Sequence, residues 1–385
     1  MRYTIVTETY PPEVNGVALT VQGLERGLRA RGNDVDVVRP RQLADASRAS
    51  VEANETLVRS LPLPRYPDLR IGLPATRRLR KAWAERRPDA IYVATEGPLG
   101  WSALRAARQL NIPAATGFHT RFDEYMRDYG AAFLQATALR WMRRFHNGAD
   151  ATLVPTRELQ AFLQARGFEK AVRLPRAVDT ALFDPARRDA ALRASWGVAD
   201  DALAVIYVGR LAAEKNLSLA ITAFRELQKQ QPGARYVWVG DGPLREQLQR
   251  DNPDFIFCGV QRDTTLARHF ASGDLFLFPS HTETFGNVTL EAMASGVPTI
   301  AFDYGAAHET LRDGVHGATI ADGDDAGFRA AVLRIGNDPA LRAIMAMAAR
   351  EAVASLHPEQ VACDFDDILH DLALARRPHA QPVVA

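Results

Sequence analysis

Two glutamates, Glu283 and Glu291, occupy a loop and a helix that follow a predicted buried strand. The apolar run at residues 274–279 is typical of such a strand ended by proline, and the helical pattern after it stops at Gly296. In an α/β unit the carboxyl end of a strand faces a helix N-terminus, where free N–H groups and the helix dipole favour an anion. Glu291 lies among small apolar residues, so its carboxylate is expected to face inward and to need a hydroxyl partner. The pair therefore predicts a ligand site rather than two surface acids.

Two cations, Arg210 and Lys215, lie on one predicted strand-to-helix loop. A buried strand at residues 204–208 delivers Gly209 and Arg210 into this loop, and Lys215 precedes a helix predicted at residues 217–228. Arginine offers a planar fork of donors and lysine a compact point charge, so together they could hold a diphosphate. The sequence therefore predicts an anion-binding loop here.

Gly16 and His119, in the first half of the chain, could also contact a ligand. Gly16 precedes a helix predicted at residues 18–31, where a glycine lets the backbone approach a phosphate closely. His119 lies at the carboxyl end of a predicted strand, where open sheets bind ligands. A lone glycine or histidine in such a place is more often structural. The chain lacks the Gly-x-Gly-x-x-Gly spacing here, which argues against an ordinary NAD-binding protein.

Alternating strand and helix patterns must position these residues, and they fall into two halves. The strands expected in the first half are residues 3–7, 34–38, 90–94, 113–120 and, as its last strand, 151–156. Residues 172–179 are interpreted as a hinge, and the strands expected after it are residues 204–208, 236–239, 255–260, 274–279 and 298–302. Residues 338–376 have a helical pattern, and residues 377–385 are expected to be disordered. Such βαβ units cross over right-handedly, which predicts an α/β fold with two parallel sheets.

Composition limits the class of protein. The chain has 385 residues, 47% hydrophobic and 24% charged, which suits two or three globular domains. A net charge of +1 gives no general bias toward nucleic acid, and no run approaches the roughly 18 apolar residues of a membrane span. The first residues run directly into a strand pattern without a secretory signal, and two cysteines make neither a metal spacing nor a disulfide framework. We therefore expect a cytoplasmic, reduced protein.

Several of these stretches resemble one known family. The Glu283 and Glu291 spacing, with Phe285 and Gly286 between them, resembles the Glu-x7-Glu signature of retaining family 4 glycosyltransferases (glycosyltransferase group 1). Residues 209–216 resemble that family's Gly-Arg-Leu-x3-Lys-Asn diphosphate clamp. Residues 117–125 resemble the Phe-His-Thr segment of its lipid-directed subgroup, which transfers mannosyl, glucosyl or sulfoquinovosyl groups. The resemblance covers about residues 3–374 and implies a GT-B fold, in which two Rossmann-like doubly wound parallel-sheet domains face each other across a cleft.

The resemblance implies a role for each matching position. Glu291 would hold the ribose hydroxyls of the donor, Glu283 would lie by the 3- and 4-hydroxyls of the donor sugar, and His119 would contact that sugar near C6. Arg210 and Lys215 would stabilise the charge that grows on the departing diphosphate. The other positions implied to bind substrate are Gly16, Val17, Arg121, Asp123, Tyr125, Gly209, Asp241, Gly259, Val260, Phe285, Gly286, Asn287, Val288 and Glu309.

Three groups of these positions carry more specific expectations. Gly16 and Val17 belong to an Asn-Gly-Val loop that, in the family, closes over the donor diphosphate and the acceptor. The strand end at Gly259 and Val260 would meet the nucleobase through its backbone. The acceptor is expected beside Arg121, Asp123 and Tyr125. The chain departs from the family pattern at residues 176–177, where Arg-Ala replaces the usual Asn-Gly of the hinge, and at residue 306, where alanine replaces a glycine.

The resemblance also implies domain boundaries and a reaction. The acceptor-side domain would span residues 1–174, completed by a final helix at about 357–376, and the nucleotide-sugar domain would span residues 175–356. The reaction would move a hexose from GDP-mannose or a UDP-hexose to a hydroxyl of a lipid or glycan, with retention by a front-face path. No Asp-x-Asp stands in a suitable loop, so we predict a metal-independent transfer without a cofactor other than the donor.

Two basic stretches of the first half allow two interpretations. Their cations are Arg65, Arg70, Arg77, Arg78, Arg80, Lys81, Arg86, Arg87, Arg140, Arg143 and Arg144. In residues 61–87 an apolar stripe of Leu73, Leu79 and Trp83 is consistent with a solvated helix that packs on the sheet. The other interpretation is binding of an anionic partner, either an anionic membrane at its cytoplasmic face, where the protein would dock peripherally, or an anionic acceptor.

Other functions remain open from the sequence. A transferase of this type could act on a soluble sugar or an exopolysaccharide intermediate instead of a lipid. A sugar-nucleotide epimerase shares the two-domain fold, and product analysis separates it from a transferase. A binding or scaffold protein could keep the fold without transfer, although the intact Arg210, Lys215, Glu283 and Glu291 speak against it.

Overall fold

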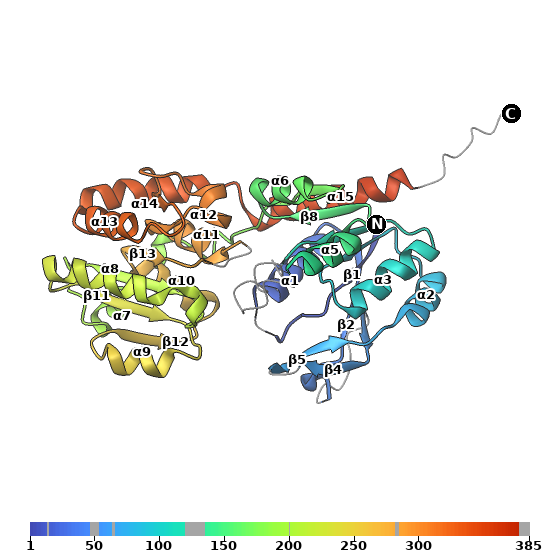
Figure 1. The fold of residues 1–385 in the computed structure, drawn as a ribbon, viewed down its shortest axis with the longest axis horizontal. Helices are drawn as coiled ribbons and strands as arrows, with labels where there is room; N and C mark the ends of the chain where they lie inside the picture. The colour runs from blue at the N-terminus through green and yellow to red at the C-terminus, as the bar shows by residue number, and fades with distance from the viewer. Residues whose placement is uncertain are drawn as a thin grey trace. The chain divides into compact units, whose positions relative to one another are not determined.

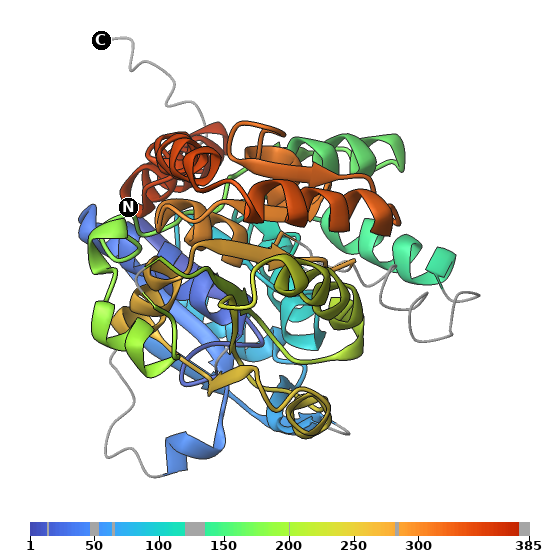
Figure 2. The same ribbon diagram turned by 90° about the vertical axis from the view of Figure 1, so that its left-hand side faces the viewer.

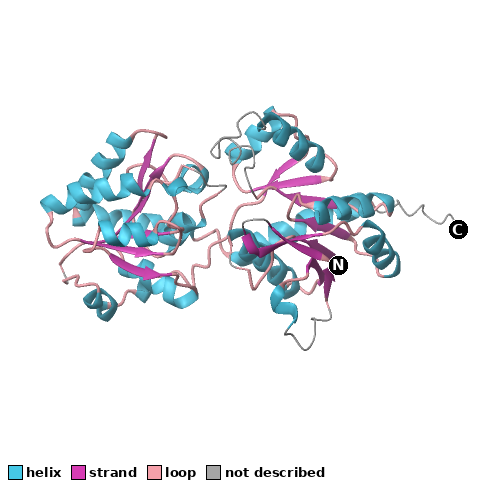
Figure 3. Cartoon of the chain, turned by 60° about the horizontal axis from the view of Figure 1, so that its bottom comes forward, coloured by secondary structure: helices cyan, strands magenta, loops and turns pink. Residues whose placement is uncertain are grey.

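The computed structural model describes residues 1–13, 15–46, 54–63, 66–119, 135–199, 201–281 and 285–376. The chain divides into two compact units, the first made of Met1–Arg176 and Pro358–Ala385 and the second of Ala177–His357. In each unit the strands form the interior and helices cover them (Figure 3). Arg121, Asp123, Tyr125, Glu283 and the tail at residues 377–385 lie outside the described residues.

The first unit is built on a seven-stranded parallel sheet of order β3-β2-β1-β6-β7-β8-β9. Its strands are β1 (Arg2–Val6), β2 (Asp34–Pro40), β3 (Glu55–Val58), β6 (Ala90–Val93), β7 (Ala114–Gly117), β8 (Ala151–Val154) and β9 (Ala171–Arg173). Its helices are α1 (Gly16–Ala30), α2 (Thr76–Glu85), α3 (Pro98–Gln109), α5 (Gln135–His146), α6 (Arg157–Ala165) and α15 (Pro358–Ala375), with a 3-10 turn η1 at Leu43–Ala46. The chain order reverses between β1 and β6, so the switch point of this sheet lies at their carboxyl ends.

The last helix, α15, completes the first unit by packing on α1 (Figure 1). A Cβ atom on Gly27 of α1 would lie only 2.3 Å from the Cβ of Ala362, so a glycine is needed for this close approach. The hydroxyl of Tyr3 in β1 donates to the carboxylate of Asp366 at 2.9 Å, which joins the first strand to the last helix. The first strand, the first helix and the last helix therefore belong to one packed unit.

The second unit is built on a six-stranded parallel sheet of order β12-β11-β10-β13-β14-β15. Its strands are β10 (Ala204–Val208), β11 (Arg235–Val239), β12 (Ile256–Gly259), β13 (Leu275–Phe278), β14 (Thr299–Phe302) and β15 (Gly317–Ile320). Its helical elements are η3 (Pro185–Arg187), α7 (Ala190–Ser195), η4 (Ala213–Lys215), α8 (Leu217–Gln230), α9 (Arg245–Asp251), α10 (Asp263–Ser272), α11 (Asn287–Ala294), α12 (Gly305–Thr310), α13 (Asp325–Gly336) and α14 (Pro339–Val353). Helices α8 and α13 lie side by side (Figure 2). Here the switch point lies between β10 and β13, the strands that precede the predicted cation loop and glutamate motif.

These two sheets confirm the predicted α/β class, but two sequence expectations are wrong. Residues 60–63 and 66–72 do not continue a helix: they are the antiparallel hairpin strands β4 (Ser60–Leu63) and β5 (Tyr66–Gly72), and helix α2 follows them. Pro62 stands inside β4, and a proline in a helix interior removes a hydrogen bond and clashes with the preceding turn. On α2 itself, Leu79 and Trp83 form the expected buried stripe.

The predicted last strand of the first half is also not the last. Strand β9 follows β8 and includes residues 172 and 173 of the stretch interpreted as the hinge. A three-residue strand at the edge of a sheet is too short to show a periodic pattern, so it could not be predicted from the sequence.

Candidate functional site

In the second unit, backbone hydrogen bonds join the loops that follow β10, β11 and β12. Leu211 N donates to the carbonyl of Asp241 at 2.9 Å, and Gly240 N donates to the carbonyl of Gly259 at 2.8 Å. A Cβ on Gly240 would lie 1.9 Å from the carbonyl oxygen of Gly209, so no other residue allows these loops to approach so closely. The predicted positions Gly209, Asp241 and Gly259 therefore lie on one joined edge of the sheet.

Arg210 and Lys215 lie on the loop between β10 and α8, as expected. Arg210 is 45% exposed and its guanidinium lies 3.5 Å from the carboxylate of Glu214, while its carbonyl accepts from the Tyr207 hydroxyl at 3.0 Å. Lys215 is half-buried at the end of η4, where Asn216 adopts a left-handed conformation with φ 49° and starts α8. Both cations thus stand at the carboxyl end of β10 near a helix N-terminus, a place that favours an anion.

Two further positions on this edge have different surroundings. The carboxylate of Asp241 accepts from Gly242 N at 2.7 Å and from Arg245 at 2.8 Å, and these bonds lower its pKa. Asp241 therefore shapes its own turn. Val260 is 53% exposed and borders an open hollow together with Arg262 and Asp263 at the start of α10, where a nucleobase was expected.

The described part of the glutamate motif surrounds the start of α11. Gly286, at φ 89°, precedes the helix, and Asn287 and Val288 form its half-buried first turn. The carbonyl of Phe285 accepts from Ala306 N at 2.6 Å, so the first residues of α12 are tied to the motif. Alanine at position 306 is compatible with this contact, and Glu309 lies half-buried further along α12.

Glu291 is half-buried on α11, and among the described residues its carboxylate has no hydrogen-bond or ion-pair partner. Burial raises the pKa of this carboxyl to about 7. A carboxylate in this state gains most from a ligand that brings hydroxyl donors.

His281 is a polar residue of this edge that the sequence analysis missed. Its Nε2 lies 3.0 Å from the amide nitrogen of Asn216, its Nδ1 lies 2.6 Å from the carboxylate of Asp322, and its ring stacks on Phe302. It therefore connects the loops after β10, β13 and β15. Its only sequence signal is its position two residues before Glu283, which is too weak to identify a role.

In the first unit, Gly16 and Val17 begin α1 behind an ordered cap. Asn15 accepts from Ala18 N at 2.9 Å and donates to the hydroxyl of Thr9 at 2.6 Å. Gly16 is exposed and Val17 is half-buried. Their backbone is thus held at the carboxyl side of β1 with the glycine accessible.

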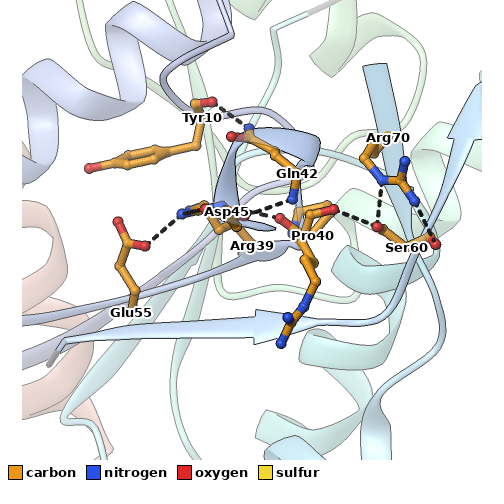
Figure 4. A network of polar contacts seen from close by, with 9 residues as sticks. Tyr10, Arg39, Pro40, Gln42, Asp45, Glu55, Ser60 and Arg70 are labelled. Atoms are coloured by element: carbon orange, nitrogen blue, oxygen red, sulfur yellow. Dashed lines mark hydrogen bonds and ion pairs between the residues drawn. The ribbon is translucent and has the colours of Figure 1, made fainter. Parts of the chain in front are cut away.

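A buried ion cluster supports the loop before α1 (Figure 4). Arg39 is fully buried. Its guanidinium forms a bidentate salt bridge with the carboxylate of Asp45, at 2.8 and 2.9 Å, and a second salt bridge with the carboxylate of Glu55 at 2.7 Å. Gln42 donates from its backbone N to Asp45 and from its side chain to the carbonyl of Tyr10, both at 2.7 Å. The sequence analysis did not single out these residues, which hold the loop that leads to Gly16.

His119 follows β7 and is 7% exposed. Its Nε2 lies 2.8 Å from the Tyr92 hydroxyl and its Nδ1 lies 2.5 Å from a guanidinium nitrogen of Arg176. Burial is the main cause that holds the pKa of His119 well below its usual value, and the positive charges of Arg176 and His146 act in the same direction. The imidazole is therefore neutral. A Cβ on Gly117 would lie 2.1 Å from the Tyr92 hydroxyl, so this glycine makes room for the contact.

Both halves of the chain match known glycosyltransferase families. The family described as Glycosyltransferase Family 4 matches residues 14–182, and the one described as Glycosyl transferases group 1 matches residues 202–338. The chain is 36% identical over 309 residues to a GDP-mannose-dependent alpha-mannosyltransferase of Mycolicibacterium smegmatis, covering 79% of this chain and 80% of the relative. The chain belongs to glycosyltransferase family 4. It is a nucleotide-sugar-dependent hexosyltransferase, as the resemblance implied.

Two other similarities agree with this family. The chain is 27% identical over 333 residues to an alpha-monoglucosyldiacylglycerol synthase of Streptococcus pneumoniae, covering 83% of this chain and 75% of the relative. The solved structure of sucrose-phosphate synthase from Thermosynechococcus elongatus matches with a TM-score of 0.80 at 22% identity, over 97% of this chain and 99% of that one. The second similarity supports the GT-B fold of this family 4 enzyme.

Two further observations concern metals and membranes. Within the described ranges, no cluster of three or more histidine, cysteine, aspartate or glutamate side chains could bind a metal ion. None of the described helices is long and apolar enough to span a bilayer.

Proposed function

We propose that this family 4 enzyme transfers mannose from GDP-mannose to a hydroxyl of a lipid acceptor, with retention of the anomeric configuration. The observation that carries the proposal is the half-buried carboxylate of Glu291, which has no partner in the described part of the chain. It stands after β13, and Arg210 and Lys215 stand after β10, the two strands that border the switch point of their sheet. A nucleotide-diphosphate sugar offers both hydroxyls for the acid and a diphosphate for the cations.

The donor proposal assigns roles within the second unit. Glu291 holds the ribose hydroxyls, and the backbone at Gly259 and Val260 meets the base. Arg210 supplies a planar fork and Lys215 a point charge to the diphosphate. GDP-mannose is favoured over a UDP-hexose because the relative that is 36% identical is named as GDP-mannose-dependent.

The proposed reaction balances without a covalent enzyme intermediate. The bond between C1 of the sugar and the β-phosphate oxygen breaks, and its electron pair stays on the diphosphate. The acceptor oxygen bonds to C1 from the same face, and its proton passes to the leaving phosphate. Arg210 and Lys215 stabilise the charge on that phosphate, a task that many transferases leave to a metal ion, so we propose that no metal is required.

A lipid acceptor is supported by the first unit. Helix α5 carries three exposed arginines around Trp141, which is 43% exposed, while Met142 and Phe145 are buried. Such a helix can lie on an anionic bilayer with its tryptophan at the interface. The alpha-monoglucosyldiacylglycerol synthase among the relatives acts, by its name, on a diacylglycerol lipid. We propose peripheral binding at the cytoplasmic membrane face.

The first test is a thermal-shift series with GDP, UDP and ADP, with and without EDTA. A ligand that binds only the folded state raises the melting temperature by mass action, and we expect GDP to do so equally in both conditions. Stabilisation by UDP alone would replace the donor, and dependence on a metal would overturn the metal-free mechanism. Transfer from radiolabelled GDP-mannose is then compared between dioleoylglycerol vesicles and a soluble mannoside. Product in the soluble arm alone would overturn the lipid acceptor.

The same assay tests the cation loop. We expect Lys215→Ala to lower turnover by two to three orders of magnitude with an unchanged melting temperature, because the leaving diphosphate loses its point charge. Lys229→Ala, on exposed helix α8 surface of the same unit, is the matched control. Full activity in the Lys215 variant would remove that residue from the mechanism.

A further inference from the structure

Arg176 is the last residue of the first unit and the point at which this chain departs from the family's Asn-Gly hinge. Its guanidinium lies 2.5 Å from Nδ1 of His119, and Nε2 of the same ring lies 2.8 Å from the hydroxyl of Tyr92. The three side chains come from one half of the parallel sheet, in which the order is β6-β7-β8-β9: Tyr92 is in β6, His119 follows β7 and Arg176 follows β9. They meet toward the carboxyl ends of those strands, the edge at which α/β sheets bind ligands.

The donors and acceptors of this chain of contacts allow one arrangement of protons. A guanidinium has only N–H donors, so Nδ1 of His119 must be the acceptor of the bond from Arg176. In a neutral imidazole the proton then resides on Nε2, which donates to the oxygen of Tyr92. Both ring nitrogens are therefore engaged, and the tautomer is set by Arg176 rather than by Tyr92, whose hydroxyl can either donate or accept.

The charged and titratable groups around the ring favour the same state. Arg176 and His146 both oppose a positive charge on His119. Glu96, the nearby buried acid, lies 3.3 Å from Nε2 of His146, and its contact is with that second histidine. In the described part of the chain no carboxylate pairs with Arg176, so its guanidinium is half-buried without a counter-ion. An arrangement of this kind costs stability, which indicates a role other than packing.

We propose that Arg176 is a positioning residue, whose guanidinium fixes His119 as the neutral Nε2–H tautomer and so keeps the ring in one orientation toward the substrate. This rests on the proposed function and on the family resemblance, which implies that His119 contacts the donor sugar near C6. It excludes His119 as a proton carrier in transfer, because a second proton on Nδ1 would face the guanidinium. Arg176 then compensates for the family's missing Asn-Gly turn by a side-chain contact, and the identity of this residue becomes a determinant of turnover.

The tautomer is measured first, by nitrogen NMR of the full-length protein labelled with 15N-histidine, with His119→Asn to assign the signal. We expect wild-type His119 to show a bare Nδ1 and a protonated Nε2 from pH 6 to pH 8. In Arg176→Met the Nδ1–H form appears, because the donor to Nδ1 is gone. In Tyr92→Phe the wild-type tautomer persists, because Arg176 remains. An unchanged His119 spectrum in Arg176→Met, or a changed one in Tyr92→Phe alone, would overturn the proposal.

Turnover is measured on the same variants. Arg176→Met should lower kcat by roughly tenfold or more with little change in KM. The melting temperature should not fall, because the loss of one hydrogen bond is offset by the removal of a charge that has no counter-ion among the described residues. Arg176→Lys, which keeps a donor but not the fork, should recover part of kcat. Arg105→Met, which removes an exposed arginine from α3, is the matched control. Wild-type kcat in Arg176→Met would contradict the positioning role. Absence of transfer by the wild-type protein would contradict the proposed function alone, since the tautomer readout needs no substrate.

Discussion

The carboxylate of Glu8 accepts the backbone N–H of Leu99, in the first turn of α3, at 3.0 Å and that of Gly72, at the end of β5, at 2.5 Å. One acid thus joins three elements beside the switch point of the first sheet. Gly97 makes room for it, because a Cβ there would lie 2.2 Å from the carboxylate. Burial raises the pKa of Glu8 to about 7 even though both N–H bonds favour the ionised form.

Replacing Glu8 by alanine should destabilise the protein. The N–H groups of Gly72 and Leu99 would lose their acceptor, and each unsatisfied buried donor costs about 1–3 kcal/mol. We expect a melting temperature several degrees lower in differential scanning calorimetry. Glu85→Ala, at an exposed position at the end of α2, serves as the control. Equal melting temperatures for the two variants would show that Glu8 does not hold these elements together.

Gly117→Ala should disturb the contact beneath His119. The added Cβ would lie 2.1 Å from the Tyr92 hydroxyl and 2.5 Å from Nε2 of His119, and such overpacking typically costs 1–3 kcal/mol. Tyr92→Phe removes the nearer atom, so the double variant should be less destabilised than the sum of the single variants. A double-mutant cycle from urea denaturation measures this coupling. Strict additivity would mean that the alanine is accommodated by movement elsewhere.

Much of the edge of the second sheet that carries Arg210, Lys215 and Glu291 could be predicted because its signals are local in sequence. A buried strand, a loop with Arg210 and Lys215, and a following helix all lie within residues 204–230, and parallel α/β topology then fixes the edge of the sheet at which the loop lies. The glutamate motif obeys the same rule, since Glu291 stands on α11 directly after β13. Periodicity and strand order were sufficient there.

The other features could not be predicted, because they depend on contacts between residues far apart in the sequence or on residues that rule out a helix. Arg176 and His119 are 57 positions apart, and nothing in the sequence marks their contact. The burial of Arg39 between Asp45 and Glu55 cannot be predicted from local sequence, because it arises only when β2 and β3 pair. The hairpin β4–β5 was missed because a basic, apolar mixture resembles an amphipathic helix when the prolines in it are not weighed.

Glu291→Gln should remove a pH dependence of donor binding. The carboxyl has a pKa of about 7 without ligand, and the ribose hydroxyls donate to its ionised form, so GDP affinity should rise with pH through 7. Between pH 6 and pH 8 the gain is about tenfold if only the ionised form binds. Isothermal titration at both values should show this slope in the wild type and in Glu246→Gln, whose side chain is 91% exposed, but not in Glu291→Gln. A slope retained in Glu291→Gln would assign the ionisation to another group.

The same substitution should affect stability with the opposite trend. The folded-state pKa of Glu291 lies above the ordinary glutamate value of 4.5, so its contribution to stability is fully present below pH 4.5 and is lost as pH rises through about 7. Without ligand, Glu291→Gln should therefore melt higher than the wild type at pH 8 and show no such advantage at pH 5. Thermal denaturation at the two pH values measures this difference. An advantage at pH 5 alone would contradict the raised pKa.

Binding to anionic vesicles should depend on α5. Its exposed arginines are Arg140, Arg143 and Arg144. Trp141 lies exposed among them and stacks on buried Phe145, with the two ring centroids 6.5 Å apart. The helix therefore presents its cations and an interfacial ring together.

Each cation near an anionic surface contributes about 1 kcal/mol, so replacing all three by glutamine should weaken binding to phosphatidylglycerol vesicles about a hundredfold. The effect should shrink in high salt and be absent on phosphatidylcholine, because charge is screened or missing there. Arg312→Gln, an exposed position of the second unit, is the control in a vesicle co-sedimentation assay. Equal sedimentation of the triple variant and the wild type would remove α5 from the membrane-binding surface.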